Sequence, residues 1–83
     1  MIYTVLWVPS AMSALADIWM NAPDRLAVTA ASNDIDAQLR VDAQRKGRTF
    51  HDRRLFVTRP LAVTFKVDSG DRKVFVLQVG RIA

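Results

Sequence analysis

The residues of this chain that could do chemistry are mostly basic, and they are densest between residues 43 and 52. This segment, AQRKGRTFHD, places Arg45, Lys46 and Arg48 close to the aromatic Phe50. Lysine and arginine clusters beside an aromatic side chain are typical of surfaces that contact phosphate groups. A solvated connector can have the same composition, so the pattern leaves two interpretations, a phosphate-contacting loop and a plain basic loop.

His51 is the single histidine of the sequence. An imidazole titrates close to neutral pH, so this side chain could act as a general acid or base, or take part in stacking. A lone histidine in a loop is also commonly a plain surface residue. The sequence contains no cysteine, which excludes disulfides and thiolate metal sites and fits a reducing compartment. We therefore expect no metal centre and no cofactor.

The net charge of +4 is unevenly divided along the chain. Residues 1–43 hold two basic and five acidic side chains, a sum of −3, whereas residues 44–83 hold ten basic and three acidic ones, a sum of +7. Such an asymmetry accelerates association with polyanions and with acidic protein segments alike. It indicates a class of partner without choosing one member of that class.

The length of 83 residues predicts one domain that spans residues 1–83. A domain of this size buries only about 60–65% of the surface of its unfolded chain, so we expect marginal stability without a partner that completes the core. No apolar run approaches the roughly 20 residues of a membrane span, and no basic segment precedes an apolar stretch at the amino terminus. We expect a cytoplasmic protein without a membrane segment.

The first half of the sequence predicts one strand followed by two helices. Residues 2–8, IYTVLWV, are rich in β-branched and aromatic side chains, which is typical of a strand buried on both sides. Ser10 occupies the N-cap position of a first helix, and Pro23 and Asp24 occupy the first turn of a second one. These helices are expected to form an antiparallel hairpin on one face of a sheet. Their apolar stripes are Ala11, Leu15, Ile18 and Ala22 in the first helix and Val28, Ala31, Ile35 and Leu39 in the second.

Residues 53–79 predict a meander of three strands, and the pairing register decides which side chains face the core. An odd-length loop at Arg59-Pro60 would pair Val57 with Val63, which places the apolar side chains of both strands on the same face of the sheet. The same criterion at the second turn aligns Phe65 with Phe75. We therefore predict this register. The predicted core face comprises Leu55, Val57, Leu61, Val63, Phe65, Phe75, Leu77 and Val79. The predicted open face carries Arg54, Phe56, Thr58, Thr64, Lys66 and Gln78, with an apolar strip at Val74 and Val76.

The order of strand, helix, helix and three-stranded meander resembles the RelE/ParE toxins of bacterial type II toxin–antitoxin modules. The likeness covers nearly the whole chain, and its pieces are YTVLWVPSAMSALADIW, APDRLAVTAASNDIDAQL, FHDRRLFVTRPLAVTFKVD and VFVLQVGR. These are fold-level patterns and not a catalytic motif. The resemblance implies an α+β domain of order β-α-α-β-β-β, an antiparallel sheet with a helical hairpin packed on one face.

One branch of this family, the RelE-like toxins, consists of ribosome-dependent endonucleases that cut mRNA. The reaction needs activation of the ribose 2′-hydroxyl, charge stabilisation on the phosphate and protonation of the leaving oxygen. The resemblance implies catalytic roles for Arg54, Arg59 and Arg81 as phosphate contacts and for His51 as the general acid or base. The residues implied to bind RNA or another target are Arg45, Lys46, Arg48, Arg53 and Lys66.

The sequence departs from the RelE-like pattern at two places. Ala62 stands near the position where active relatives have an arginine, and the single tyrosine is Tyr3, far from the carboxyl-terminal position at which relatives often carry an aromatic residue. The nuclease site is therefore expected to be incomplete. The ParE-like branch inhibits DNA gyrase and needs no nuclease residues, so Arg81 would there be a binding residue. A non-toxic interaction module of the same fold is a third interpretation.

All three interpretations share one implied partner, a cognate antitoxin that wraps an extended and helical segment over the toxin. An acidic amphipathic segment would bury apolar surface and pair charge at once. We expect it to contact Phe56, Val74 and Val76 on the predicted open face. The further partners implied are the ribosome and mRNA, or DNA gyrase.

Overall fold

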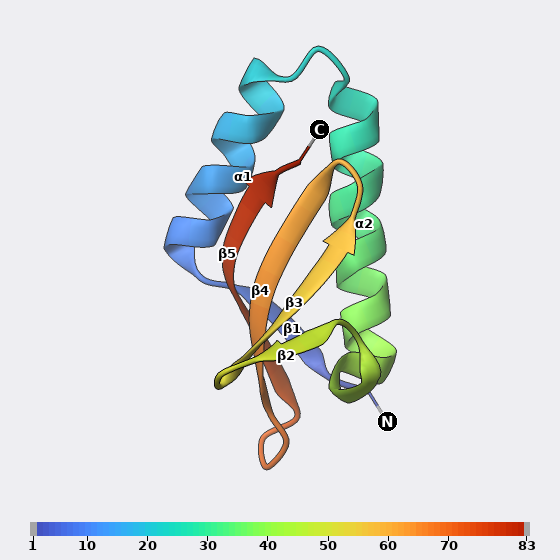
Figure 1. Ribbon diagram of the computed structural model, residues 1–83, viewed down its shortest axis with the longest axis vertical. Coiled ribbons are helices and arrows are strands. Elements are labelled where there is room, and N and C mark those ends of the chain that lie inside the picture. Colours follow the sequence, from blue (N-terminus) through green and yellow to red (C-terminus); the bar gives the residue numbers. More distant parts are fainter. Residues whose placement is uncertain (1, 83) are drawn as a thin grey trace.

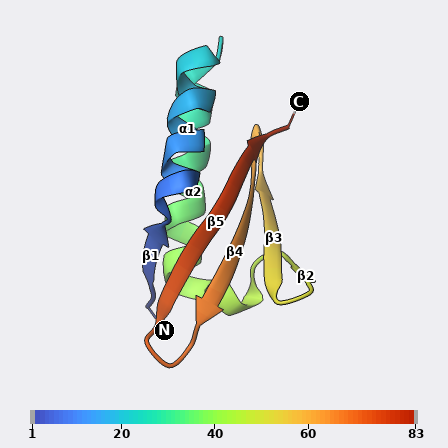
Figure 2. The ribbon, with the colours of Figure 1, turned by 90° about the vertical axis from the view of Figure 1, so that its left-hand side faces the viewer.

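Two helices cover one face of a five-stranded sheet in the computed structural model, which describes residues 2–82 (Figure 1). Figure 2 shows both helices on the same side of the sheet. The elements are β1 (Thr4–Trp7), α1 (Pro9–Asn21), α2 (Arg25–Asp42), the short 3-10 helix η1 (Ala43–Arg45), β2 (Arg48–Phe50), β3 (Arg53–Thr58), β4 (Leu61–Asp68) and β5 (Lys73–Arg81). The predicted α+β class is confirmed. Neither helix within residues 2–82 is long and apolar enough to cross a membrane.

The sheet is mixed, with the strand order β1-β5-β4-β3-β2. β1 runs parallel to β5, and the remaining neighbours are antiparallel, which corrects the prediction of a wholly antiparallel sheet. β2 lies within the segment predicted as a basic loop. Its backbone pairs with β3 across a two-residue turn, so it forms a strand without any alternation of apolar side chains to signal it.

The register between β3 and β4 is set by a two-residue turn. Thr58 lies opposite Leu61, which leaves Arg59-Pro60 as the loop and places Leu55 opposite Thr64. The predicted odd-length loop is therefore wrong. A shift of one residue in pairing turns a strand over, so the side chains of β3 face the opposite way from the prediction.

The reversal of β3 is visible in the exposure of its side chains. Leu55 and Val57, predicted in the core, are 38% and 46% exposed. Phe56, predicted on the open face as a partner contact, is half-buried and packs against the core beneath the helices. Apolar side chains thus lie on the open face of β3, where the sequence pattern predicted polar ones.

An irregularity between β4 and β5 changes the second register as well. The pairing shifts between Thr64 and Phe65, so that Phe65 lies opposite Val76 and not opposite the predicted Phe75. Leu77 is left without a partner in β4. An extra residue of this kind re-aims the side chains that follow it along the strand.

The core lies between the helices and the central strands. Val74 and Val76 have 0% exposure, so the predicted apolar strip on the open face is wrong, and neither residue is available to a partner. The predicted stripe of α2 is buried in full, whereas in α1 Leu15 and Ile18 are only partly buried. The buried apolar residues are Tyr3, Ala11, Ala22, Val28, Ala31, Ile35, Leu39, Ala43, Leu61, Val63, Phe65, Val74 and Val76.

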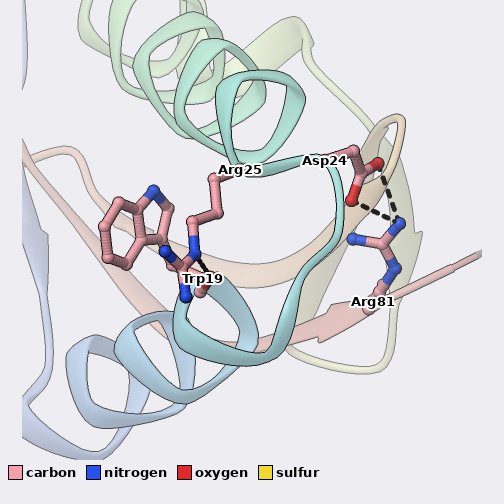
Figure 3. Close-up of polar contacts among 4 residues, drawn as sticks. All are labelled: Trp19, Asp24, Arg25 and Arg81. Carbon is pink, nitrogen blue, oxygen red and sulfur yellow. Dashed lines mark hydrogen bonds and ion pairs between the residues drawn. The ribbon is translucent and has the colours of Figure 1, made fainter.

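The helix ends differ in detail from the prediction. α1 begins at Pro9 with Val8 as its N-cap, two residues earlier than the expected Ser10 cap. Its last carbonyl groups are capped by Arg25, which donates hydrogen bonds to the oxygens of Trp19 (3.1 Å) and Met20 (2.8 Å). The Arg25 guanidinium also lies 4.7 Å from the centre of the Trp19 ring (Figure 3). One side chain thereby satisfies orphan carbonyls and stacks on an aromatic face.

Gly47 makes the connection between η1 and β2 possible. Its φ of 72° is in the left-handed region, and a Cβ at this position would lie 2.3 Å from the backbone oxygen of Leu55. Both features favour glycine, because a positive φ is energetically unfavourable for residues with a Cβ, and a carbonyl held in a sheet cannot move aside freely.

We predict that Gly47→Ala lowers the free energy of unfolding by about 1–3 kcal/mol, because it combines a strained φ with a backbone clash. The melting temperature, measured by circular dichroism, should fall by roughly 5–20 °C. Gly80→Ala is the matched control, since a Cβ there meets no atom within 4 Å. Equal melting temperatures for the two variants would show that the close approach at Gly47 is not tight.

Candidate functional site

A polar groove of about 420 Å³ lies at the end of the sheet where β2 turns into β3. It gathers three basic side chains, one carboxylate and the imidazole at a single place. The lining residues are Gln44, Thr49, His51, Asp52, Arg53, Arg54, Phe65, Lys66, Val67 and Ser69. No other region of residues 2–82 combines a histidine with several cations, so this groove is the strongest candidate for a functional site.

The β2–β3 turn positions two of the groove residues. Phe50 lies opposite Arg53, which leaves His51 and Asp52 as a two-residue turn, and His51 has a φ of 57°. Positive φ is typical of tight hairpin turns. Arg53 Nε lies 3.9 Å from Asp52 Oδ1, and both side chains are well exposed, so this ion pair holds the arginine only weakly. The Phe50 side chain lies outside the described part of the structure.

Lys66 and two arginines share the open face of the sheet. Residues directly opposite one another in antiparallel strands lie on the same face. Arg48 lies opposite the exposed Leu55, and Arg53 is two positions from Leu55 along β3, so both arginines belong to the open face. Lys66 is exposed on the same face, because its neighbour Phe65 is buried under the helices. The arrangement presents three cations beside apolar surface, which suits a polyanion that also carries flat apolar groups.

Arg54 lies on the helix side of the sheet and not on the predicted open face. It is opposite Phe65, whose side chain is in the core, and it is partly buried. Arg54 Nη1 donates a long hydrogen bond of 3.4 Å to the Lys46 backbone oxygen. This contact ties the segment before β2 to β3. Arg54 lines the groove from the helix side of the sheet, as do its cross-strand neighbours Thr49 and Phe65, and the Lys46 carbonyl holds it there.

The structure does not bring the four predicted catalytic residues together. His51 and Arg54 lie at the groove, whereas Arg59 is in the β3–β4 turn and Arg81 lies opposite Leu61 at the other end of the sheet (Figure 1). The five residue steps from Leu61 to Lys66 span roughly 17 Å along β4. Arg45, a predicted binding residue, is not in the groove either. Its Nε lies 3.8 Å from Asp42 Oδ1 on the adjoining helical turn.

Arg81 is held by an acidic residue that the sequence did not mark as functional. Its Nη2 donates to Asp24 Oδ2 at 2.9 Å and lies 2.8 Å from Asp24 Oδ1 (Figure 3). The hydrogen bond from Arg81 lowers the pKa of the Asp24 carboxyl below its usual value of 3.8, and Asp24 in turn raises the pKa of Arg81. Asp24 is the N-cap residue of α2, not a first-turn residue as predicted, and its side chain makes no capping hydrogen bond there.

Sequence reasoning missed the other polar members of the groove. Gln44 and Ser69 are 25 positions apart, and their side chains hydrogen-bond to each other across the groove. Thr49 and Asp52 also line it. No periodicity or motif joins these residues, because the β2 pairing that assembles them was not predicted. Residues 2–82 contain no group of three histidine or acidic side chains placed to hold a metal ion.

Comparison with known proteins gives matches among solved structures alone. No family model matches the chain, and no curated protein matches it. The toxin–antitoxin complex RelBE2 from Mycobacterium tuberculosis matches with a TM-score of 0.81 at 18% identity, over 98% of this chain and 99% of that one. The ParDE system from P. aeruginosa matches with a TM-score of 0.69 at 19% identity, over 99% and 98%. The isolated E. coli RelE toxin gives 0.55 at 19% identity, over 98% and 85%.

These matches define the class of fold. The chain has the two-helix, mixed-sheet α+β fold of toxin subunits from toxin–antitoxin systems. More particularly, it has the RelE/ParE fold over essentially its whole length, which confirms the resemblance inferred from the sequence. Fold alone does not fix the activity, because one fold can support several.

The Asp24–Arg81 pair predicts a specific acid sensitivity. The pKa of Asp24 is lower in the folded chain than its ordinary 3.8, so the pair stabilises the fold at pH values above 3.8, and this stabilisation is lost as the pH falls below 3.8 through the lowered pKa. We expect Asp24→Asn and Arg81→Ala to show coupled losses of melting temperature at about pH 7. The coupling should weaken as the pH falls below 3.8, because protonation of the Asp24 carboxylate removes the ion pair. Purely additive losses at about pH 7 would contradict the pairing.

Proposed function

We propose that this chain is the toxin component of a type II toxin–antitoxin system and acts on translation as a ribosome-dependent mRNA endonuclease. The observation that carries the proposal is the groove at the β2–β3 turn, in which His51 lies with Arg53, Arg54 and Lys66. The fold shared with RelE supports the choice of target. In this proposal single-stranded RNA lies in the groove and extends onto the open face, where Arg53 and Lys66 are exposed.

The groove contains side chains for phosphate binding and for one proton transfer, but it lacks a second proton-transfer group. Arg53 and Lys66 would neutralise the phosphate and stabilise the charge that develops on it, and Arg48 would hold a neighbouring phosphate. His51 would accept the proton of the 2′-hydroxyl or protonate the leaving 5′-oxygen. The residues that line the described groove include no tyrosine that could act as a second proton-transfer group. Ala62 of β4 carries no charge that could stabilise the phosphate. Because only His51 can transfer a proton in this proposal, we expect slow cleavage that depends on the ribosome to align the RNA.

Arg54, Arg59 and Arg81 take different roles in this proposal. Arg54 shapes the groove through its contact with the segment before β2. Arg59 lies in the turn beyond Leu61, more than roughly 17 Å from Lys66 along the strands, so it would contact a phosphate further along a bound RNA and not the scissile one. Arg81 lies opposite the core-facing Leu61 and is bonded to Asp24, so it lies on the helix side of the sheet and takes no part in the groove.

Inhibition of DNA gyrase is the second candidate. The observation in its favour is the match to the ParDE system, which covers 98% or more of both chains. In this case the basic face would contact gyrase or DNA without chemistry, and His51 would have no catalytic role. A non-toxic module of the same fold would affect neither process.

We predict that induction of the wild-type chain stops incorporation of labelled methionine before incorporation of labelled thymidine. His51→Ala and Lys66→Ala should each relieve the arrest, by about 10²-fold or more in the cleavage rate for the acid–base residue. Arg40→Ala is the matched control, because it removes the same charge from the surface of α2, where Arg40 pairs with Asp36. Earlier loss of thymidine incorporation would favour gyrase as the target, and arrest that survives His51→Ala would exclude the nuclease mechanism.

The cognate antitoxin is the proposed protein partner, and a groove on the outer side of the helical hairpin fits it. This outer groove has a volume of about 400 Å³ and almost no polar lining. It presents exposed apolar side chains at Met12 (51%), Trp19 (42%) and Met20 (63%). Met12 also lines an adjoining groove of about 490 Å³ that runs to β1. The combined surface is apolar along the hairpin and partly polar toward β1, where Asn33 and Asp36 line it, which suits an amphipathic segment. Methionine side chains adapt readily to such a partner.

We predict that Met12→Glu weakens binding of the protein encoded beside this gene by about tenfold or more, because it places a charge where the two grooves meet. Binding can be followed by calorimetry and by the Trp19 fluorescence. Leu26→Glu is the control, since Leu26 is 88% exposed and lines neither groove. Equal affinities for the two variants would place the antitoxin elsewhere.

A further inference from the structure

A second groove, of about 480 Å³, lies on the open face of the sheet, and none of the residues that line it is charged. Its floor is formed by β4 and β5, where Ala62 lies opposite Gly80. The next pair on this face is Thr64 and Gln78. Leu55 of β3 borders the groove on one side, because it lies opposite Thr64 and is exposed on the open face. We call this feature the uncharged groove.

The other side of the uncharged groove is formed by the first turns of α1. β1 ends at Trp7, opposite Val76, so no strand of the described chain lies along the outer edge of the second half of β5. Ser10 and Ala14 of α1 border the groove at this edge. Figure 2 shows α1 on one side of β5, with β4 and β3 on the other. The groove therefore has one wall from a helix and one from a strand.

The floor of the uncharged groove offers hydrogen-bonding groups in an apolar setting. Thr64 Oγ1 donates a long hydrogen bond of 3.4 Å to Gln78 Oε1. This bond leaves the Gln78 Nε2 group as a donor and the Thr64 oxygen as an acceptor. A nucleobase has a flat apolar body and an edge that carries donors and acceptors side by side. An apolar side chain of a protein partner would cover these polar atoms without pairing them, which is unfavourable.

Three cations lie at the rim of the uncharged groove. Arg48 is directly opposite Leu55, so their side chains are neighbours on the open face. Arg53 is two positions from Leu55 along β3, and Lys66 is two positions from Thr64 along β4, roughly 7 Å in each case. One sugar joins the base of a nucleotide to its phosphate. A phosphate held by these cations can therefore place its base over the groove floor.

We propose that the uncharged groove binds one nucleobase of a single-stranded RNA whose adjacent phosphate is held by Lys66 and Arg53. Gln78 and Thr64 hydrogen-bond to the edge of the base, and Leu55 packs against its face. This inference rests on the proposed function, since it assigns the nucleotide beside the phosphate bound at the polar groove. The uncharged groove contributes selectivity for base-bearing chains and no general attraction for polyanions.

The test compares two labelled chains of equal length and charge, an oligouridylate and an oligomer of abasic ribose phosphates, by fluorescence anisotropy. The wild type should bind the oligouridylate about 5–10-fold more tightly. Gly80→Leu should abolish this preference by weakening the oligouridylate complex alone, because its side chain fills the groove and a Cβ at Gly80 meets no atom within 4 Å. Gly70→Leu is the matched control, since Gly70 lies in the β4–β5 turn outside the groove.

Two further variants keep the test decisive if Gly80→Leu does not fold. Gln78→Leu changes an exposed side chain and should reduce the preference to about twofold. Lys66→Ala should weaken both chains equally, because it removes a phosphate contact and no base contact. A preference that survives the changes at Gly80 and Gln78 overturns the proposal. So does a Gly80→Leu variant that loses affinity for the protein encoded beside this gene while its preference for the oligouridylate is unchanged.

A second readout separates this inference from the proposed function. The Leu55 methyl resonances are followed by NMR while uridine, an uncharged nucleoside, is added. They should shift in the wild type and in Gly70→Leu but not in Gly80→Leu. If they do so while neither chain binds, the base site stands and RNA binding fails. If both chains bind the wild type equally, in a Lys66-dependent manner, the base site is overturned and RNA binding stands.

Discussion

The unpaired residue between β4 and β5 is the constraint on which the two faces of the sheet depend. Val74 and Val76 point toward the helices, and strict alternation would direct Gln78 there next. Because Leu77 has no partner in β4, the alternation is reset, so Val79 packs against the core and Gln78 is exposed. The longest strand can therefore follow the helical layer over its whole length without burying a polar amide.

The open face follows from this arrangement together with the two-residue turn at Arg59-Pro60. The turn directs Leu55 and Val57 away from the helices, onto the same face as Lys66. That face consequently combines exposed apolar side chains with cations, while Arg54 is drawn to the helix side. The cations at the β2–β3 end form a groove, whereas the Arg59 and Arg81 end does not belong to it. Arg81 lies opposite the core-facing Leu61, so it is on the helix side, and the basic residues are divided between the two faces of the sheet.

Predictions from the sequence succeeded where one periodicity decided the outcome. The stripe of α2 needed only the helical repeat, and all of its members, Val28 to Leu39, are buried. The register of β3 failed because matching apolar faces was the wrong criterion: the turn fixed the pairing, and Leu55 was left exposed. β2 was missed because its residues, Arg48–Phe50, show no alternation of apolar side chains that would signal a strand. The groove was therefore foreseen as a set of basic residues near His51 but not as a cavity with Gln44 and Asp52 in it.

The distribution of ion pairs explains why the basic face stays basic. The helical half of the chain is acidic and the sheet half is basic, yet the pairs Asp36–Arg40, Asp42–Arg45 and Asp52–Arg53 each join residues within four positions. Such exposed local pairs neutralise charge weakly and leave the long-range field intact. The Asp24–Arg81 pair differs, because it brings an acid of the helical half onto the sheet. The fold consequently gathers basic side chains at the groove end, whereas Arg81 at the other end of the sheet is neutralised by Asp24.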